Sequence, residues 1–249
     1  MTATERDLQT TMQQYSCDRR TAQHLYDGKA AVNYCRPLLD KATHIARQCG
    51  TDIAALADRW DLTPEQKLTG EKNLIAAATD QLTDLSIQVK AGRAEGEAAL
   101  RRALRAAVEP QGVDGELRHA RTWARIQRRL DNGDTIDHIL TEATTDDDLP
   151  TLHALAAEAP TWWQNTHGAP IPDGHLDAIY RHGPPAAAEA WSLLRELHTG
   201  VDRTIGTITD HSKRLPDGGS PGVIRWDGTP DIRPDLAADA AHSSSRGDA

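Results

Sequence analysis

Phenylalanine is absent from this 249-residue chain, and aromatic residues as a whole make up only 4% of it. A hydrophobic core must therefore be built from Leu, Ile, Val, Ala and the six Trp. Ala and Leu favour helices, whereas β-branched and aromatic residues favour strands, so this composition predicts an all-α protein. The length is enough for one large domain or two small ones.

Cysteine is also scarce, with only Cys17, Cys35 and Cys49, and no two of them form a CxxC pair. This pattern excludes a disulfide framework and a zinc ribbon and predicts reduced thiols. No stretch approaches the roughly 20 apolar residues of a membrane span. The polar segment 1–14 lacks the apolar core of a signal peptide. We therefore expect a cytoplasmic protein with no membrane contact, or a virion-associated one if a phage encodes it.

Sequence signatures of catalysis are missing as well. The chain has no G-x-S-x-G, no phosphate-binding or dinucleotide-binding glycine pattern and no kinase signature. Two groups of candidate metal ligands show no spacing typical of a metal site, so metal binding stays open. The smaller group is Asp134, Asp137 and His138, which can equally be a helix cap and surface residues. We expect neither an enzyme nor a cofactor, and a metal-dependent enzyme is the third hypothesis. The larger group of candidate ligands is His167, Asp173, His175, Asp177 and His182.

Apolar residues recur at alternating spacings of three and four in three long stretches, which predicts amphipathic helices. The stripes run from Leu25 to Cys49, from Leu68 to Val89 and from Ala187 to Ile208. They can face the protein's own core or a partner, and the first is the simpler hypothesis. The second stripe follows a strong helix start at 63–66, where Thr63 and Gln66 can form a capping box. The third predicts a helix over 185–214.

Glycine and proline predict where these helices break. Pro37 indicates either a kink or a second helix from Arg36, and Gly50 indicates a helix end before a short helix over 53–60. The glycines within 91–96 predict a bend. Further breaks are expected at a turn over 112–115, at a helix start capped by Asp134, and in an irregular stretch over 161–185. These signals predict an array of roughly seven to nine helices.

Charge is distributed unevenly along the chain. Residues 1–130 carry a net charge of +3 and residues 131–249 a net charge of −12, which together give the −9 of the whole chain. We predict an N-terminal helical unit over 1–130, an acidic helical unit over 131–215, and a disordered tail over 216–249 in which 222–226 could dock locally.

Arginines concentrate between residues 93 and 129, where nine of them face only five acidic residues. Such a strip can be solvated, pair with the acidic half of the same chain, bind an acidic partner or bind phosphate. The negative charge of the whole chain argues against a dedicated nucleic-acid binder. The candidate interaction strip consists of Arg101, Arg105, Arg118, Arg121, Arg125, Arg128 and Arg129.

The segment Leu56–Leu68 resembles the helix-turn-helix element of bacterial regulators, in which Leu-Ala precedes a tight turn and a capped second helix. The resemblance implies that Gln66, Lys67 and Lys72 would face the major groove of DNA. The segment departs from the pattern at Asp61, where such turns usually carry Gly. Its second helix is also predicted to be much longer than a recognition helix. A DNA-binding regulator is therefore the alternative hypothesis.

The segment Asp148–Pro160, which precedes a pair of tryptophans, resembles short helical segments in uncharacterised proteins from structural gene clusters of actinobacterial phages. The resemblance implies a part in assembling a virion. Our first hypothesis is thus a non-enzymatic helical protein that binds another protein or itself, in the assembly of a phage or other mobile-element particle. The sequence identifies neither the partner nor the oligomeric state.

Overall fold

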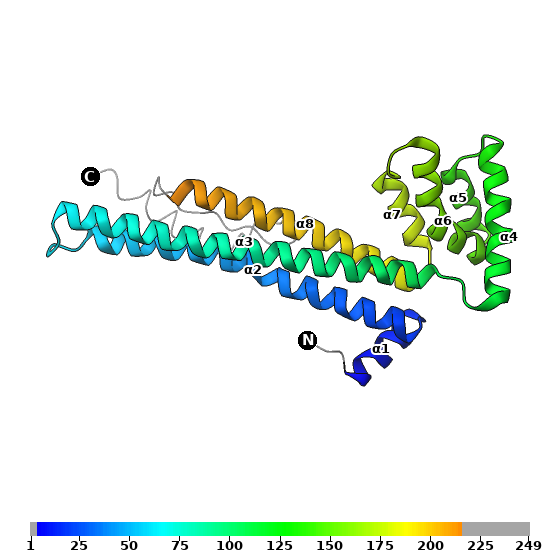
Figure 1. Cartoon of the computed structure of the whole chain (residues 1–249), viewed down its shortest axis with the longest axis horizontal. Coiled ribbons are helices and arrows are strands. Elements are labelled where there is room, and N and C mark those ends of the chain that lie inside the picture. Colours follow the sequence, from blue (N-terminus) through cyan, green and yellow to red (C-terminus); the bar gives the residue numbers. More distant parts are fainter. Residues whose placement is uncertain (1–3, 216–249) are drawn as a thin grey trace, which may run out of the picture. The chain divides into compact units, whose positions relative to one another are not determined.

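The computed structural model describes residues 4–215 of the chain (Figure 1). This part forms eight helices and no strand, so the all-α prediction and the expected number of helices are confirmed. The predictions for the tail 216–249, including local docking of 222–226, lie outside the described residues. The helices are α1 (Glu5–Tyr15), α2 (Arg19–Ala57), α3 (Pro64–Val108), α4 (Gly112–Asp131), α5 (Ile136–Thr145), α6 (Leu149–His167), α7 (Asp173–His182) and α8 (Pro185–Arg214).

The chain divides into two compact units, each assembled from separate stretches of sequence. Unit 1 comprises residues 1–32 and 94–197, and unit 2 comprises residues 33–93 and 198–249. Helices α2, α3 and α8 each contribute residues to both units. The boundary expected near Leu130 falls inside unit 1, close to the end of α4. The basic stretch 94–130 and most of the acidic stretch after it therefore belong to the same unit.

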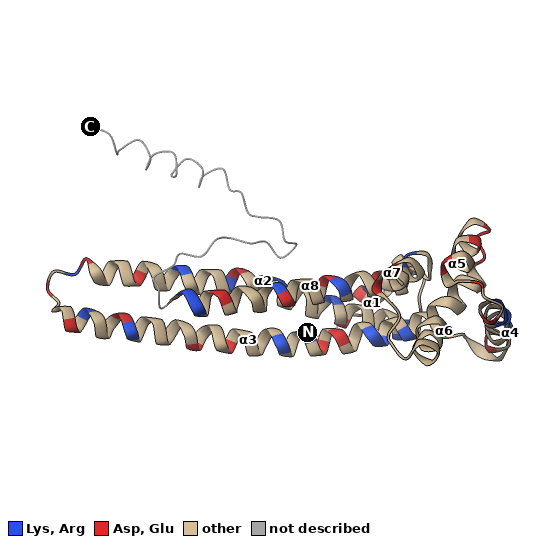
Figure 2. Cartoon of the chain, turned by 90° about the horizontal axis from the view of Figure 1, so that it is seen from above, with Lys and Arg blue, Asp and Glu red and all other residues tan. Residues whose placement is uncertain are grey.

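In unit 2, the described residues form three helix segments that lie side by side, from α2, α3 and α8 (Figures 1 and 2). Their apolar stripes face the core, as the heptad spacing predicts, except at Leu68, which is 53% exposed. Large side chains from all three segments are almost completely buried there, including Leu39 of α2, Leu82 and Leu85 of α3, and Val201 of α8. Burial of such stripes is the main source of stability for helices of this kind.

Helix α2 passes without a break through both of the positions at which a boundary was expected. Of the two alternatives at Pro37, one continuous helix is found, and the helix end at Gly50 is wrong. Proline removes one backbone hydrogen bond, but Leu38 and Leu39 next to it are buried and hold the helix in place. The separate short helix over 53–60 is also wrong, because α2 continues to Ala57.

Helix α3 is continuous through 91–96, so the predicted bend is wrong. The glycines there serve close helix packing instead. In unit 2, a Cβ atom at Gly92 would lie 2.7 Å from Cys35 Sγ. In unit 1, a Cβ atom at Gly96 would lie 2.8 Å from Ala31 Cβ and 2.8 Å from Leu197 Cδ2. Only glycine fits at such distances, and the helix tolerates its flexibility because the neighbouring helices hold it.

Unit 1 contains a cluster of shorter helices, in which α4 and α5 pack on α6, and α7 packs on both α5 and α6. Ile126, Ile139, Leu155 and Ile179 fill its centre. Three boundaries differ from prediction. Helix α4 begins at Gly112, so 112–115 is its first turn. Thr135, not Asp134, caps α5. Most of the stretch over 161–185 is helical, because α6 continues through Pro160, beside the buried Ala159, and α7 follows.

The helices of residues 4–215 are all too short or too polar to cross a lipid bilayer.

Candidate interaction surface on helix α4

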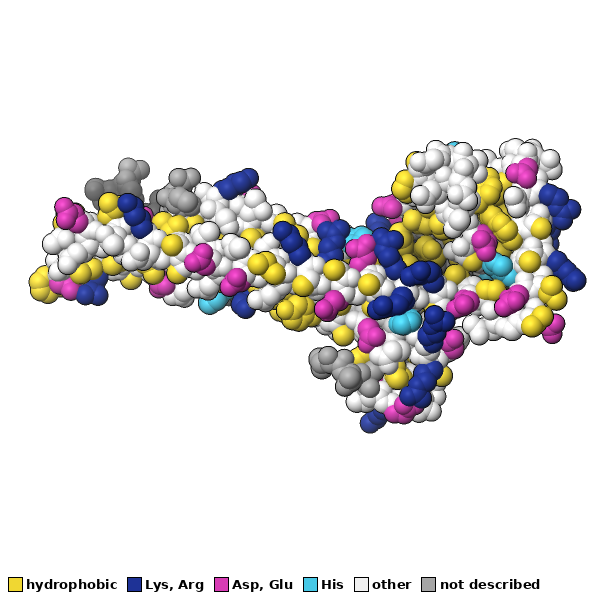
Figure 3. All heavy atoms as spheres, in the orientation of Figure 1, with side chains coloured by type: hydrophobic (Ala, Val, Ile, Leu, Met, Phe, Trp, Pro, Cys, Tyr) yellow, Lys and Arg dark blue, Asp and Glu magenta, His cyan; other side chains and the backbone are white. Residues whose placement is uncertain are grey.

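Five arginines share one side of α4, and we call this side the arginine face. A helix turns by about 100° per residue, so spacings of three, four, three and one place these side chains within about 100° of the circumference. Basic residues mark α4 in Figure 2, and Figure 3 shows Lys and Arg side chains standing out along its outer edge, at the right of the view. The arginine face consists of Arg118, Arg121, Arg125, Arg128 and Arg129.

Two of these arginines bind the acidic part of the same unit. Arg125 Nη2 lies 3.2 Å from Asp148 Oδ2, and Arg129 Nη2 lies 2.6 Å from Asp134 Oδ2 and 2.7 Å from Glu142 Oε2. The pKa of Asp134 is lowered to about 2 by hydrogen bonds from the His138 imidazole and then from Arg129. Of the alternatives for the strip, pairing with the acidic half of the same chain is therefore found at Arg125 and Arg129. These pairs hold α4 against α5 and α6.

The other three arginines of the face have no ion pair within residues 4–215. Arg118 Nε donates to the backbone oxygen of Asp114 at 3.2 Å, and Arg128 Nε donates to that of Ala124 at 3.1 Å. These bonds orient each side chain along the helix and use only the Nε donor. The terminal guanidinium nitrogens of both side chains, and the whole of Arg121, are left available to a partner.

An apolar stripe lies directly beside the arginine face. Val113 is 71% exposed and Leu117 is 51% exposed, and Ala120 and Ala124 continue the stripe as exposed residues. The spacing of Leu117, Ala120 and Ala124 by three and four residues predicts that they face the core of the protein, and this prediction is wrong. Helix α4 carries two apolar stripes, and it packs on α6 with the one that holds Ile126 and other large residues, because burying these removes more apolar area from water.

Arg101 and Arg105 of the predicted strip belong to α3 and not to α4. Arg101 Nη2 lies 2.7 Å from Glu97 Oε1, one turn earlier on the same helix. Arg105 Nε donates to the backbone oxygen of Arg101 at 3.4 Å. The predicted strip therefore consists of two parts on separate helices, of which only the α4 part forms a continuous face.

The residues of the helix-turn-helix alternative lie at the turn between α2 and α3. Gln66 Oε1 accepts a hydrogen bond from Thr63 N at 2.8 Å, and Gln66 N donates to Thr63 Oγ1 at 3.3 Å, which confirms the capping box. Lys67 Nζ donates to the backbone oxygen of Ala57 at the end of α2, at 2.5 Å. Lys72 is exposed on α3. Gln66 and Lys67 thus bind the backbone of the turn, and Lys72 is the one of the three that makes no such contact within residues 4–215.

Three of the five candidate metal ligands in 167–182 contact other residues and not one another, and His167 and His175 both lie against the ring of Trp163. The ring of His167 stacks on Trp163 with centroids 4.1 Å apart, and His175 Nδ1 lies 2.8 Å from Asp137 Oδ1. Asp177 accepts hydrogen bonds from Trp191 Nε1 at 2.6 Å and from Arg195. Within the part of the chain that the structure describes, no three His, Cys, Asp or Glu residues come together in an arrangement that could hold a metal ion.

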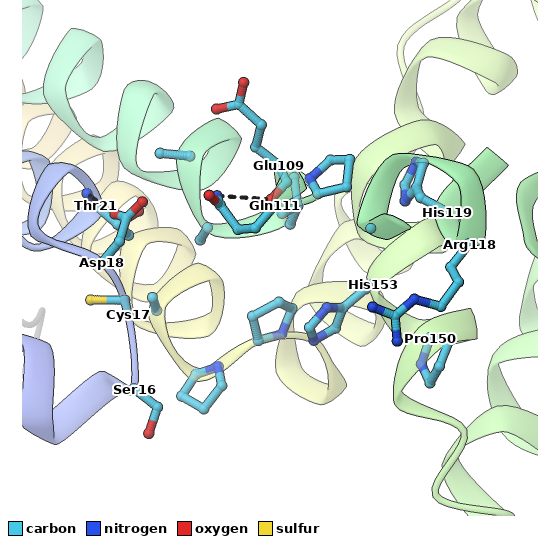
Figure 4. A pocket seen from close by; sticks show the side chains of 18 of the residues that line it. Ser16, Cys17, Asp18, Thr21, Glu109, Gln111, Arg118, His119, Pro150 and His153 are labelled. Atoms are coloured by element: carbon cyan, nitrogen blue, oxygen red, sulfur yellow. Dashed lines mark hydrogen bonds between the residues drawn. The ribbon is translucent and has the colours of Figure 1, made fainter. Parts of the chain in front are cut away.

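A cavity of about 830 Å³ in unit 1 escaped prediction from the sequence. Its wall combines residues from the α1–α2 turn, the end of α3, α4, the start of α6 and the α7–α8 junction, and Figure 4 shows several of the polar side chains among them. These segments are far apart in the sequence, and each of them is short. No periodicity or spacing could have indicated that they meet.

Comparison of the chain with protein-family models, with curated proteins and with solved structures found no match in any of the three. The exposed side chains of α4 and the cavity are therefore the features from which function is inferred.

Proposed function

We propose that this protein is a non-enzymatic interaction protein that binds an acidic, amphipathic helix of a partner protein through α4. The observation that carries the proposal is the apolar stripe of Val113 and Leu117 beside the arginine face. An amphipathic helix with acidic residues along the edge of its apolar side would bury the stripe and pair with the arginines at the same time. The partner is either a different protein or a second copy of this chain.

The pairing within unit 1 supports this choice of partner. Arg125 and Arg129 already pair with carboxylates from the start of α6, the α4–α5 connection and α5. A carboxylate is therefore a group that the arginine face already binds within this chain. Nucleic acid would use the arginines but would leave Val113 and Leu117 exposed to water, since phosphate contacts gain nothing from an apolar stripe. A chain with a net charge of −9 also repels nucleic acid at long range.

The cellular setting that we propose is the assembly of a particle, such as that of an actinobacterial phage or mobile element. This part of the proposal depends on the resemblance of residues 148–160 to short segments of phage proteins.

The test is the change in fluorescence anisotropy of labelled probes at about 50 mM salt, where phosphate contacts are also strong. One probe is an amphipathic helical peptide with leucines on one side and glutamates flanking them. A second has the same composition in scrambled order, and a third is a DNA duplex without sequence preference. We expect binding of the first peptide only. The double variant Arg121→Glu/Arg128→Glu should abolish it, and Leu117→Asp should weaken it by about tenfold or more.

The control is Arg105→Glu, which makes one such Arg→Glu substitution at an exposed arginine of α3 and should leave peptide binding unchanged. Equal binding of both peptides would contradict recognition of an amphipathic helix. Binding of the duplex that is lost on Lys67→Glu would instead support the helix-turn-helix alternative. Light scattering of the free protein distinguishes the two kinds of partner. If the partner is a second copy of this chain, the protein should be a dimer, and Leu117→Asp should dissociate it.

A further inference from the structure

The cavity of unit 1 has the size and the wall of a small-molecule site. Its volume of about 830 Å³ falls within the range of roughly 300–1,000 Å³ that small-molecule sites occupy. The space exists because much of the wall consists of small or rigid residues, among them Ala106, Ala107, Pro184 and Ala186. These residues give the cavity an apolar side formed by the end of α3 and the α7–α8 junction.

The two acidic residues of the wall are already engaged. Asp18 Oδ1 accepts a hydrogen bond from Thr21 N at 2.7 Å, which satisfies a free N–H group in the first turn of α2. Glu109 Oε2 lies 3.3 Å from Arg20 Nη1. Neither carboxylate forms an ion pair with Arg118 or Arg121 within residues 4–215.

The opposite side is formed by α4 and α6 and is rich in hydrogen-bond donors. Figure 4 shows the Arg118 guanidinium directed toward His153. Arg118 and Arg121, which both line the cavity, have no ion pair within residues 4–215. His119 is mostly buried, and its Nε2 lies 3.0 Å from Glu158 Oε1, which fixes the orientation of the ring.

We propose that this cavity binds a small organic anion, a carboxylate or phosphate carried on an apolar body. The anionic group lies between Arg118 and His153, where guanidinium and imidazole donors converge. The apolar body lies against Ala106, Ala107 and the α7–α8 junction. The site goes beyond the proposed binding of a partner helix and shares only Arg118 and Arg121 with the arginine face.

The test uses three probes that carry the same eight-carbon chain: octanoate, octyl phosphate and octylammonium. Isothermal titration calorimetry should show one octanoate or octyl phosphate bound per chain and no octylammonium. The relative affinity of the first two distinguishes a carboxylate site from a phosphate site. Arg118→Gln should raise the Kd of the bound anions by about tenfold or more. Arg128→Gln removes the same charge from α4 outside the cavity and should leave the Kd unchanged.

Cys17 supplies an independent readout, since it lines the cavity and is only partly buried, whereas Cys35 and Cys49 are buried. A maleimide should modify Cys17 first, and saturating octanoate or octyl phosphate should slow this modification, as followed by peptide mass spectrometry. Ala107→Leu, which fills part of the cavity from its apolar wall, should weaken anion binding without changing the charge.

Equal binding of octylammonium and octanoate would overturn the proposal, because it would indicate apolar binding without a role for the cations. An unchanged Kd for both Arg118→Gln and Ala107→Leu would overturn it as well, provided that each variant keeps the helical circular dichroism of the parent. Neither outcome affects the partner-helix proposal, because Leu117→Asp tests that proposal at a residue outside the cavity.

Discussion

Units 1 and 2 use helices in different ways. In the described part of unit 2, three long segments pack along one another, and their core positions repeat with heptad spacing. In unit 1, helices α4 to α7 are only 10 to 20 residues long and pack on one another. The cavity and the exposed stripes of α4 both belong to unit 1.

The difference indicates how the two kinds of packing relate to function. When long helices pack side by side, their apolar stripes are buried along most of their length. This kind of packing leaves little room for a cavity. Short helices joined by loops pack less completely. In unit 1 they leave a cavity between them and one side of α4 exposed to solvent. We therefore infer that the described part of unit 2 is structural, and both of the binding sites that we propose belong to unit 1.

The largest effect on stability is expected from truncating a core leucine in each unit, which tests whether the two units unfold independently. Leu155 of unit 1 and Leu82 of unit 2 are both completely buried. Each Leu→Ala change should cost about 2–5 kcal/mol of unfolding free energy, because it removes apolar contacts and leaves a cavity. In native-state hydrogen exchange, Leu155→Ala should speed exchange in α4–α7 and spare residues 74–90 of α3, and Leu82→Ala should do the reverse.

Equal acceleration throughout the chain in both variants would contradict the division, since it would mean that the units unfold as one. Two further leucines with exposed side chains, Leu68 of unit 2 and Leu149 of unit 1, provide controls whose truncation to alanine should change exchange little.

Glycine substitutions should change stability in opposite directions. Gly96→Ala places a Cβ atom 2.8 Å from Ala31 Cβ, which cannot move without its helix, so we expect a loss of about 1–3 kcal/mol in the free energy of unfolding. Gly50→Ala meets no atom within 4 Å and should stabilise α2 by up to about 1 kcal/mol. Urea denaturation of both variants measures the difference. A stabilising Gly96→Ala would show that the helices can separate there without cost.

Helix caps in the two units should differ in strength. Asp148 Oδ1 accepts a hydrogen bond from Thr151 N at 3.2 Å, and its Oδ2 accepts one from Thr151 Oγ1 at 2.6 Å and also pairs with Arg125. We expect Asp148→Ala to cost about 2 kcal/mol and Thr63→Ala, at an exposed cap, about 0.5–1 kcal/mol. Urea denaturation again gives both values, with Thr69→Ala as a control for Thr63→Ala. Equal costs would mean that the Arg125 pair adds nothing to the cap.

Sequence patterns predicted those parts of the fold that depend on neighbours within a helix. The capping box of Thr63 and Gln66 and the bounds of α8 at 185–214 were predicted correctly, because their signals lie within a few turns. Gly96 shows the limit of such signals. A glycine that bends a helix and one that admits a neighbouring helix look alike until the neighbour is known.

The candidate sites were predictable to different degrees. The arginines of α4 were identified from their number, but which of them are free depended on where α5 and α6 place Asp134 and Asp148. Leu117 was assigned to the wrong side because α4 has two apolar stripes and only packing decides between them. The cavity could not be predicted at all, since its wall comes from five segments joined only by the fold.

The smallest effect is expected from the pH dependence of unit 2. His211 is almost completely buried in α8, and desolvation, followed by the nearby Arg214, lowers its pKa below the usual 6.5. Below about pH 6.5 the unfolded chain binds a proton at this position that the folded chain does not, so unit 2 loses stability as the pH falls toward the lowered pKa. The loss is at most about 1.4 kcal/mol per pH unit for one proton. Hydrogen exchange of the α8 amides at pH 7 and pH 5.5, corrected for intrinsic rates, measures it. His211→Leu should remove the extra opening at pH 5.5, and His44→Leu, at an exposed position of α2, should retain it.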